Sequence, residues 1–248
     1  ALFREAYRVH PYGRPVIGYV DTIRKTTRDD LLAYFRANYV PGNMVLVLAG
    51  AVDPRSSRPL IEKTFGLLPP GSAPQAPMPT EPPQKDFRVV VKEKDARRVY
   101  LEMGFHGPSM KDPDVYAWDL LSMILGSGET SRLYRTVKDG KGLVDSVYAS
   151  SYTPRDPGLL FVGGTLSPEK ARAALKEILL ETFRLAAAPP EGAELARAKT
   201  STESDFLYSL ESQSALARHV GFYETTLSDA AFEQTYLRKI RAVTAADI

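Results

Sequence analysis

The chain has 248 residues, 44% of them hydrophobic and 25% charged, which is the composition of an ordinary globular protein with enough length for a sizeable core. Its 32 Lys and Arg nearly balance 30 Asp and Glu, which argues against binding driven by phosphate groups, so we expect no nucleic-acid partner. The absence of cysteine excludes disulfides, thiolate metal sites and a cysteine nucleophile. No apolar run approaches the roughly 20 residues of a membrane span. Because the chain does not begin with Met, we expect it to be a piece of a longer protein.

Up to residue 67 the sequence predicts two helices separated by a strand. Thr27 is a typical N-cap, and apolar residues at helical spacing follow it until Pro41 and Gly42 end the helix. The apolar run 44–49 is short and continuous, as in a strand covered on both faces. A second helix is predicted over residues 54–65, after an Asp-Pro start.

A proline-rich segment, residues 68–86, follows these elements. Each proline fixes its φ angle and lacks an N–H group, so neither a helix nor a central strand can run through the segment. We therefore interpret it as an extended linker between two domains, in preference to a ligand for a proline-binding module. The prolines are Pro69, Pro70, Pro74, Pro77, Pro79, Pro82 and Pro83.

After the linker, strands and helices come in blocks. The predicted strands are residues 87–92, 98–105, 146–152 and 158–165. The predicted helices are residues 113–125, a short one up to residue 138, a long one from 168 to about 188, and two or three more within 191–240. This order favours an α+β layer fold over a doubly wound sheet.

Two short stretches resemble each other at an offset of 217 residues, which takes residue 27 to residue 244. Residues 23–31 and 240–248 both place a Thr at a helix start and an Asp three residues later. Nine residues can match by chance, because helix caps are common. If the repeat is real, the helix and strand that follow residue 31 have counterparts beyond residue 248.

Candidate metal ligands are few. The three histidines, His10, His106 and His219, lie far apart, and neither His-x-x-Glu-His nor its inverse occurs. A site assembled from all three would need the fold to bring them together, and structural or exposed histidines are the preferred interpretation. The turn that contains Gly126 and Gly128 resembles a phosphate loop only loosely, and a helix C-cap followed by an N-cap is preferred.

Several stretches together resemble the M16 family of zinc metallopeptidases, which includes pitrilysin, insulin-degrading enzyme and mitochondrial processing peptidase. They are residues 10–18 (HPYGRPVIG), 29–31 (DDL), 39–46 (YVPGNMVL), 124–126 (ILG), 131–134 (SRLY) and 142–144 (GLV). The resemblance implies a mixed, largely antiparallel sheet with helices packed on one face, the LuxS/MPP-like metallohydrolase fold. It also implies that residues 1–67 end a zinc-domain homologue, and that 87–248 form the inactive C-terminal domain without its last helix and strand.

The resemblance carries consequences for the site. The zinc ligands of the family lie upstream of the residues given, so zinc is expected only in the full-length parent or a partner subunit, and this chain should hydrolyse nothing alone. The family's substrate-holding Arg and Tyr correspond to Lys138 and Asp145, which keep neither the guanidinium fork nor the phenol. A longer glycine-rich loop of the mitochondrial enzyme corresponds to the turn with Gly126 and Gly128.

Two functions remain open at this point. The first is the non-catalytic part of an M16-like metalloendopeptidase that helps enclose peptide substrates and pairs with another M16 subunit as a homo- or heterodimer. The second is a proteolytically inactive homologue that acts as a structural subunit. The sequence does not fix the compartment, although the resemblance favours a periplasmic or otherwise extracytoplasmic one. We further expect the strand 44–49 to fill a vacant place in the sheet of residues 87–165.

Overall fold

The computed structural model describes residues 1–74 and 77–248, so residues 75 and 76 of the predicted linker lie outside the described part. Contacts divide the chain into two compact units. The first unit comprises Phe3–Val89 with Leu210–Ser228, and the second comprises Val90–Ser209 with Asp229–Ile248. Residues 210–228 thus belong to the first unit, although they lie late in the chain.

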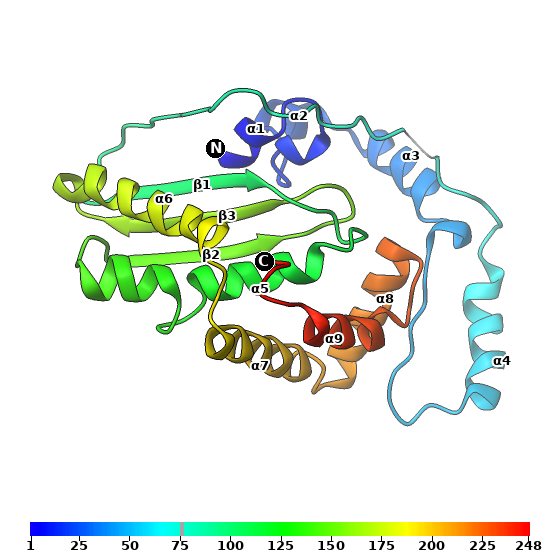
Figure 1. Ribbon diagram of the computed structural model, residues 1–248. Helices are drawn as coiled ribbons and strands as arrows, with labels where there is room; N and C mark the ends of the chain where they lie inside the picture. The colour runs from blue at the N-terminus through cyan, green and yellow to red at the C-terminus, as the bar shows by residue number, and fades with distance from the viewer. Residues whose placement is uncertain (75–76) are drawn as a thin grey trace. The chain divides into compact units, whose positions relative to one another are not determined.

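The first unit is helical. Its helices are α1 (Leu2–Ala6), α2 (Val20–Lys25), α3 (Arg28–Asn38), α4 (Pro54–Thr64) and α8 (Gln213–Leu227), with 3-10 turns at Pro11–Gly13, Pro41–Asn43 and Phe65–Leu67. The two helices predicted before residue 67 are α3 and α4 (Figure 1). Thr27 begins α3 with a capping box, in which its Oγ1 accepts from the Asp30 N–H and its own N–H donates to Asp30 Oδ2 at 2.9 Å.

The repeated sequence forms two of these hydrogen bonds a second time. Thr244 N–H donates to Asp247 Oδ2 at 2.7 Å, as Thr27 N–H does to Asp30. The Thr hydroxyl of each copy also donates to the same Asp oxygen, at 2.7 Å in both. The two stretches therefore share these two hydrogen bonds, but the Asp247 N–H donates to the Thr244 carbonyl and not to its hydroxyl, and the described residues after Thr244 form a turn instead of the expected helix.

Two strand predictions are wrong. Residues 44–49 form no strand, and Met44, Val45, Leu46 and Leu48 are between 42% and 51% exposed. Residues 87–92 also form no strand, and Val91 is 81% exposed. In both cases the apolar run has the right propensity, but it has no neighbouring strand in the described part of the chain to complete a ladder. The expectation that residues 44–49 fill a place in the sheet is therefore also wrong.

The proline-rich segment is free of helix and strand over its described residues, as predicted. Its Glu81 nevertheless makes specific contacts within the first unit. The carboxylate accepts the backbone N–H groups of Arg8, Val9 and His10 at 2.8–2.9 Å. Desolvation alone would raise the pKa of Glu81, but these three donors and the charge of Arg88 outweigh it and lower that pKa. The segment is therefore held to the turn of residues 8–10 through Glu81.

Glu81→Gln should loosen the attached turn. An amide cannot accept three N–H groups as a carboxylate does, so we expect the amides of residues 8–10 to exchange with solvent roughly tenfold faster at neutral pH. Because the pKa of Glu81 is lowered in the folded state, its contribution is present at neutral pH and is lost as the pH falls through the folded-state pKa. Hydrogen exchange measured at pH 7 and pH 3 checks this. Asp86→Asn, an exposed acidic residue nearby, is the control, and equal protection in wild type and Glu81→Gln at pH 7 would contradict the prediction.

The second unit is an antiparallel three-stranded sheet with helices. Its elements are β1 (Val99–His106), α5 (Val115–Gly126), a π-helix (Tyr134–Gly140), β2 (Ser146–Tyr152), β3 (Leu159–Leu166), a 3-10 turn (Pro168–Lys170), α6 (Ala171–Ala187), α7 (Gly192–Tyr208) and α9 (Phe232–Ala242). The strand order is β1-β3-β2, with both pairs antiparallel. The α+β fold with helices on one face is confirmed, and the strand predicted over 146–152 matches residue for residue.

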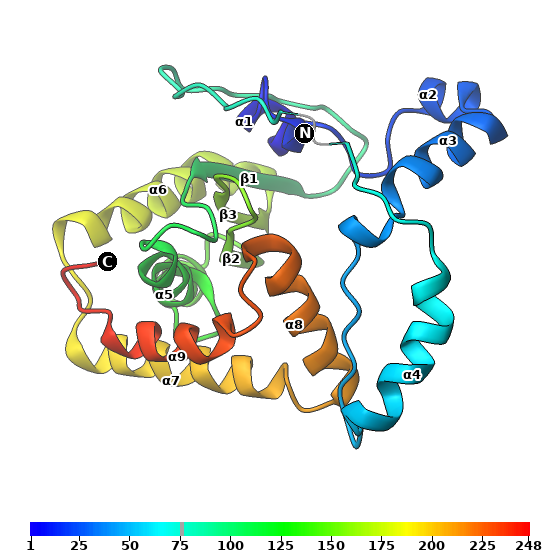
Figure 2. The ribbon, with the colours of Figure 1, turned by 90° about the vertical axis from the view of Figure 1, so that its right-hand side faces the viewer.

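One face of this sheet carries the core. The central strand β3 directs Leu160, Val162 and Leu166 to the same side, where they join Leu120 of α5 and Ile178 of α6 in one buried cluster. Figure 2 shows α5 and α6 on this side of the strands. The alternation leaves the other face of the sheet free of α5 and α6.

Candidate functional site

The face of the sheet opposite α5 and α6 carries a polar bridge across all three strands. The register aligns Glu102 of β1 with Gly163 of β3 and Tyr148 of β2. The Tyr148 hydroxyl donates to Glu102 Oε1 at 2.6 Å, over the central glycine. A Cβ at Gly163 would lie 2.9 Å from the Tyr148 hydroxyl, so a larger residue there would disturb the bridge. Tyr100 on the same face is 76% exposed.

The bridge fixes the protonation of its phenol. Desolvation and the hydrogen bond to Glu102 raise the pKa of Tyr148 to about 12. At neutral pH the side chain is therefore a neutral hydrogen-bond donor and cannot serve as a base. The sequence search missed this phenol because only the register places it beside Glu102.

Lys138 lies in the π-helix and is half-buried. Its Nζ is 4.5 Å from the centroid of the Tyr134 ring, a cation–π arrangement. The hydroxyl of the same tyrosine donates to Glu129 Oε1 at 3.3 Å. The cation predicted to contact substrate is thus held against an aromatic ring and has no ion pair among the described residues.

Asp145 has a different environment. Its Oδ2 lies 3.0 Å from Arg98 Nε, and its backbone N–H donates to the Thr165 carbonyl at 2.8 Å. In the described part of the chain no hydrogen bond or ion pair joins it to Lys138. The structure therefore gives the two residues separate partners, and their role in binding substrate stays a prediction.

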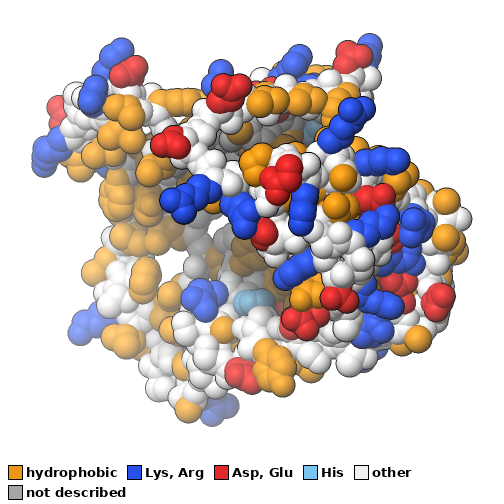
Figure 3. Space-filling view, turned by 90° about the vertical axis from the view of Figure 1, so that its left-hand side faces the viewer, with side chains coloured by type: hydrophobic (Ala, Val, Ile, Leu, Met, Phe, Trp, Pro, Cys, Tyr) orange, Lys and Arg blue, Asp and Glu red, His pale blue; other side chains and the backbone are white. Residues whose placement is uncertain are grey.

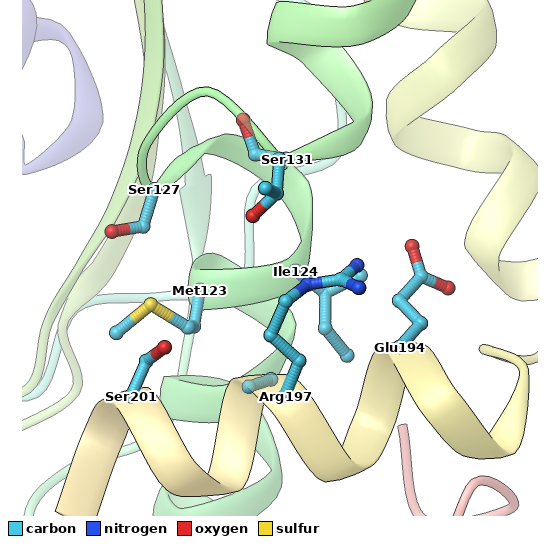
Figure 4. Close-up of a pocket in the computed structure, with 9 residues that line it drawn as sticks. Met123, Ile124, Ser127, Ser131, Glu194, Arg197 and Ser201 are labelled. Atoms are coloured by element: carbon cyan, nitrogen blue, oxygen red, sulfur yellow. The ribbon is translucent and has the colours of Figure 1, made fainter. Parts of the chain in front are cut away.

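The glycines after α5 have distinct structural reasons. A Cβ at Gly126 would lie 1.9 Å from the Ala149 backbone nitrogen, so only glycine lets α5 pack this closely on β2. Gly128 has φ +73° and open space around it, which suits a turn. Beside this turn, Figure 4 shows Glu194, Arg197 and Ser201 rising from α7 toward the end of α5. The cavity between them measures about 20 Å³, which is room for one water.

A half-buried carboxylate in α5 also escaped the sequence analysis. Asp119 accepts from Ser151 Oγ of β2 at 2.6 Å and from the Tyr236 hydroxyl of α9 at 2.7 Å. Burial raises its pKa, and the two hydrogen bonds lower it by less. An acidic residue between Trp118 and Leu120 in an apolar helix was the available signal, since a carboxylate there needs partners.

No zinc centre can be built from the described residues. His10 is 6% exposed, and its Nδ1 accepts from the Tyr12 N–H at 3.2 Å. His106 ends β1, and His219 packs edge-on against Tyr223. Residues 1–74 and 77–248 contain no group of three or more His, Cys, Asp or Glu side chains placed to hold a metal ion.

The surface and the helices give two further findings. On the face in Figure 3, Lys and Arg side chains are interspersed with Asp and Glu, and no broad area of one sign is visible. Within the described ranges, every helix is too short or too polar to cross a membrane.

The second unit, a three-stranded antiparallel sheet with helices on one face, has the class of fold that the resemblance implies. The family model for the peptidase M16 inactive domain matches residues 25–202. This chain belongs to that family, which confirms the resemblance. Because the match crosses the expected limits 1–67, 68–86 and 87–248, those limits stay predictions.

The relatives agree with this assignment. The zinc protease PqqE of Helicobacter pylori is 32% identical over 222 residues, which are 87% of this chain and 50% of that protein. The mitochondrial-processing peptidase subunit beta of Saccharomyces cerevisiae is 25% identical over 265 residues, covering 100% of this chain and 56% of that protein. The crystal structure of a protease from Helicobacter pylori superposes with a TM-score of 0.87 and 27% identity, covering 99% of this chain and 60% of that one. The chain thus spans about half the length of the relatives it matches.

Proposed function

We propose that this chain is the non-catalytic C-terminal part of an M16-like zinc metalloendopeptidase and that it helps enclose and bind peptide substrates. The observation that carries the proposal, beyond family membership, is that the sheet has two unpaired outer edges. Neither the outer edge of β1 nor that of β2 pairs with another strand of the described chain, and unpaired edges can accept an extended peptide by backbone hydrogen bonding. Tyr100 and Tyr148 supply aromatic surface beside those edges.

Peptide-bond hydrolysis would take place outside this chain. Zinc and its ligands would belong to the full-length parent or to a partner M16 subunit, in a homo- or heterodimer. A periplasmic or otherwise extracytoplasmic location is part of the same proposal, and fractionation of cells that produce the full-length protein tests it. The boundaries of residues 1–67, 68–86 and 87–248 as domain end, linker and inactive domain also belong to it.

Peptidase assays test the function. The full-length protein that contains this chain, assayed alone and with a zinc-bearing M16 partner, should cleave unstructured peptides, and a chelator should stop the cleavage. If no combination cleaves the peptides, the peptidase proposal is excluded and the structural-subunit alternative is favoured. Cleavage that a chelator does not affect would contradict it as well.

Lys138→Gln tests the proposed contact with substrate. A cation that contacts a peptide carbonyl or carboxylate contributes about 1 kcal/mol when partly solvated, so we expect KM to rise about fivefold with kcat unchanged. Lys176→Gln on α6 removes an exposed lysine from the same unit and serves as the control. An unchanged KM in Lys138→Gln would show that Lys138 does not contact the substrate. An equal change of KM in both variants would lead to the same conclusion.

A further inference from the structure

A second cavity in the second unit has a composition that the proposed function leaves unexplained. It measures about 270 Å³, against roughly 10–15 Å³ needed for one water. Helices α5, α7 and α9 and strand β2 contribute its walls. Contacts link α5 with β2, α7 and α9, and Figure 2 shows α9 running beside α7. The lining includes Asp119, Ser151, Thr202, Asp205, Phe206 and Tyr236.

The first feature is the half-buried carboxylate of Asp119, which has no cationic partner among the described residues. Ser151 and Tyr236 donate one hydrogen bond to each oxygen of Asp119, and both donors are neutral hydroxyls. No Lys or Arg lines the cavity, and no ion pair of Asp119 exists in the described part of the chain. Each carboxylate oxygen accepts more than one hydrogen bond, so capacity for a further donor remains.

The second feature is independent of the carboxylate. Thr202 lines the same cavity from α7 and is 8% exposed, and its Oγ1 has no hydrogen-bond partner among the described residues. Leaving a buried hydroxyl without a hydrogen-bond partner is unfavourable. A ligand with a polar group would remove that cost.

The third feature is the aromatic wall. The rings of Phe206 and Tyr236 stack with their centroids 5.1 Å apart. Together with Met123 they offer an apolar surface for a hydrocarbon stem and ring faces for a cation. Asp205, which also lines the cavity and is exposed, adds a second negative charge.

We propose that this cavity binds the guanidinium or ammonium group of an Arg or Lys side chain of a bound peptide. The apolar stem would lie along Phe206 and Tyr236, and the charged end would donate to Asp119. Thr202 Oγ1 would accept one of the remaining donors. The peptide origin of the cation rests on the proposed function, but the site itself does not.

Binding of a small probe tests the site without any peptidase activity. N-acetyl-arginine methylamide is titrated into the 248-residue chain, and N-acetyl-norleucine methylamide serves as the neutral probe of similar length. Chemical-shift changes of backbone amides in α5 and α7 give Kd. We expect saturable binding of the arginine probe, with a Kd at least about tenfold lower than that of norleucine.

Two variants and a control localise the binding. Asp119→Asn keeps the size of the side chain and removes its charge, so the arginine probe should bind about tenfold more weakly. Thr202→Val should also weaken binding several-fold, yet raise the thermal midpoint, because it removes an unsatisfied hydroxyl. Asp114→Asn at the start of the same helix removes an exposed charge and should leave Kd unchanged.

The outcomes separate the site from the function. Equal binding of the two probes, or wild-type affinity in both Asp119→Asn and Thr202→Val, would overturn the proposal. If Asp119→Asn does not fold, Thr202→Val alone decides. If a full-length protein without peptidase activity binds the arginine probe, the proposed cation site is supported and the proposed function is contradicted. If the full-length protein cleaves peptides but does not bind the probe, the proposed function is supported and the cation site is contradicted.

Discussion

Replacing Gly126 by alanine is expected to destabilise the second unit by about 3 kcal/mol or more. The added methyl would lie 1.9 Å from the Ala149 nitrogen and 2.6 Å from the Tyr148 carbonyl carbon. Both are backbone atoms of β2, so the clash can be relieved only by moving α5 away from the sheet. That movement would open the core at Leu125, which is fully buried.

The single tryptophan allows the stability of the second unit to be measured separately. Trp118 lies in α5, so its fluorescence during urea unfolding reports on the second unit and not on the first. Gly128→Ala is the matched control, since nothing lies within 4 Å of the added Cβ and only the φ of +73° opposes it. We expect that control to cost about 1–2 kcal/mol. If the two variants lose equal stability, packing of α5 on β2 is not the reason for Gly126.

The second large effect concerns the ion pair between the π-helix region and α7. Arg132 binds Glu194 through two parallel hydrogen bonds of 2.9 and 2.7 Å, and the two side chains are 15% and 17% exposed. Arg132→Met leaves the Glu194 carboxylate without its partner in a mostly desolvated place. We expect a loss of about 3 kcal/mol, because removing one member of a buried pair strands the other charge.

A second arginine offers a control of the same geometry. Arg241 also holds Glu203 through two hydrogen bonds, of 2.8 and 2.9 Å, but its side chain is 62% exposed. Arg241→Met should therefore cost at most about 1 kcal/mol. Urea unfolding followed by Trp118 compares the two. Equal losses would show that burial does not set the strength of these pairs.

The pH dependence of the first pair has a definite sign. The hydrogen bond from Arg132 is the main cause that lowers the pKa of Glu194 in the folded state. The stabilisation is therefore fully present above the unfolded-state pKa, near 4.3, and is lost as the pH falls through the folded-state value. The stability difference between wild type and Arg132→Met should shrink below about pH 4. A difference that is constant down to pH 2 would contradict this.

Local signals in the sequence predicted local structure well. Thr27 with Asp30 marks the start of α3, and Thr244 with Asp247 repeats the two hydrogen bonds that the Thr donates to the Asp carboxylate. The family resemblance, carried by short motifs along most of the chain, is confirmed by the match over residues 25–202. Each of these features depends on residues close together in the sequence, so each can be predicted from the sequence alone.

The failures share one cause. The run 44–49 has strong strand propensity and forms no strand, because a strand exists only where another strand offers a ladder. Asp119 in α5 escaped the sequence analysis, because its partners Ser151 and Tyr236 lie 32 and 117 residues away. Lys138 and Asp145 could be matched to family positions from the sequence. Their contacts with the Tyr134 ring and the Arg98 guanidinium could not be predicted from it.

The sequence by itself determined the family, the α+β class, the start of α3 at Thr27 and the proline-rich break, but it missed α1 and α2. Near neutrality and the absence of cysteine also narrowed the chemistry before any fold was known. The tertiary structure alone decided which runs pair as strands, why Gly126 must be glycine, and that Asp119 and Thr202 line one cavity. Caps and turns are set by residues a few positions apart, whereas pairing, packing and burial depend on residues that only folding brings together.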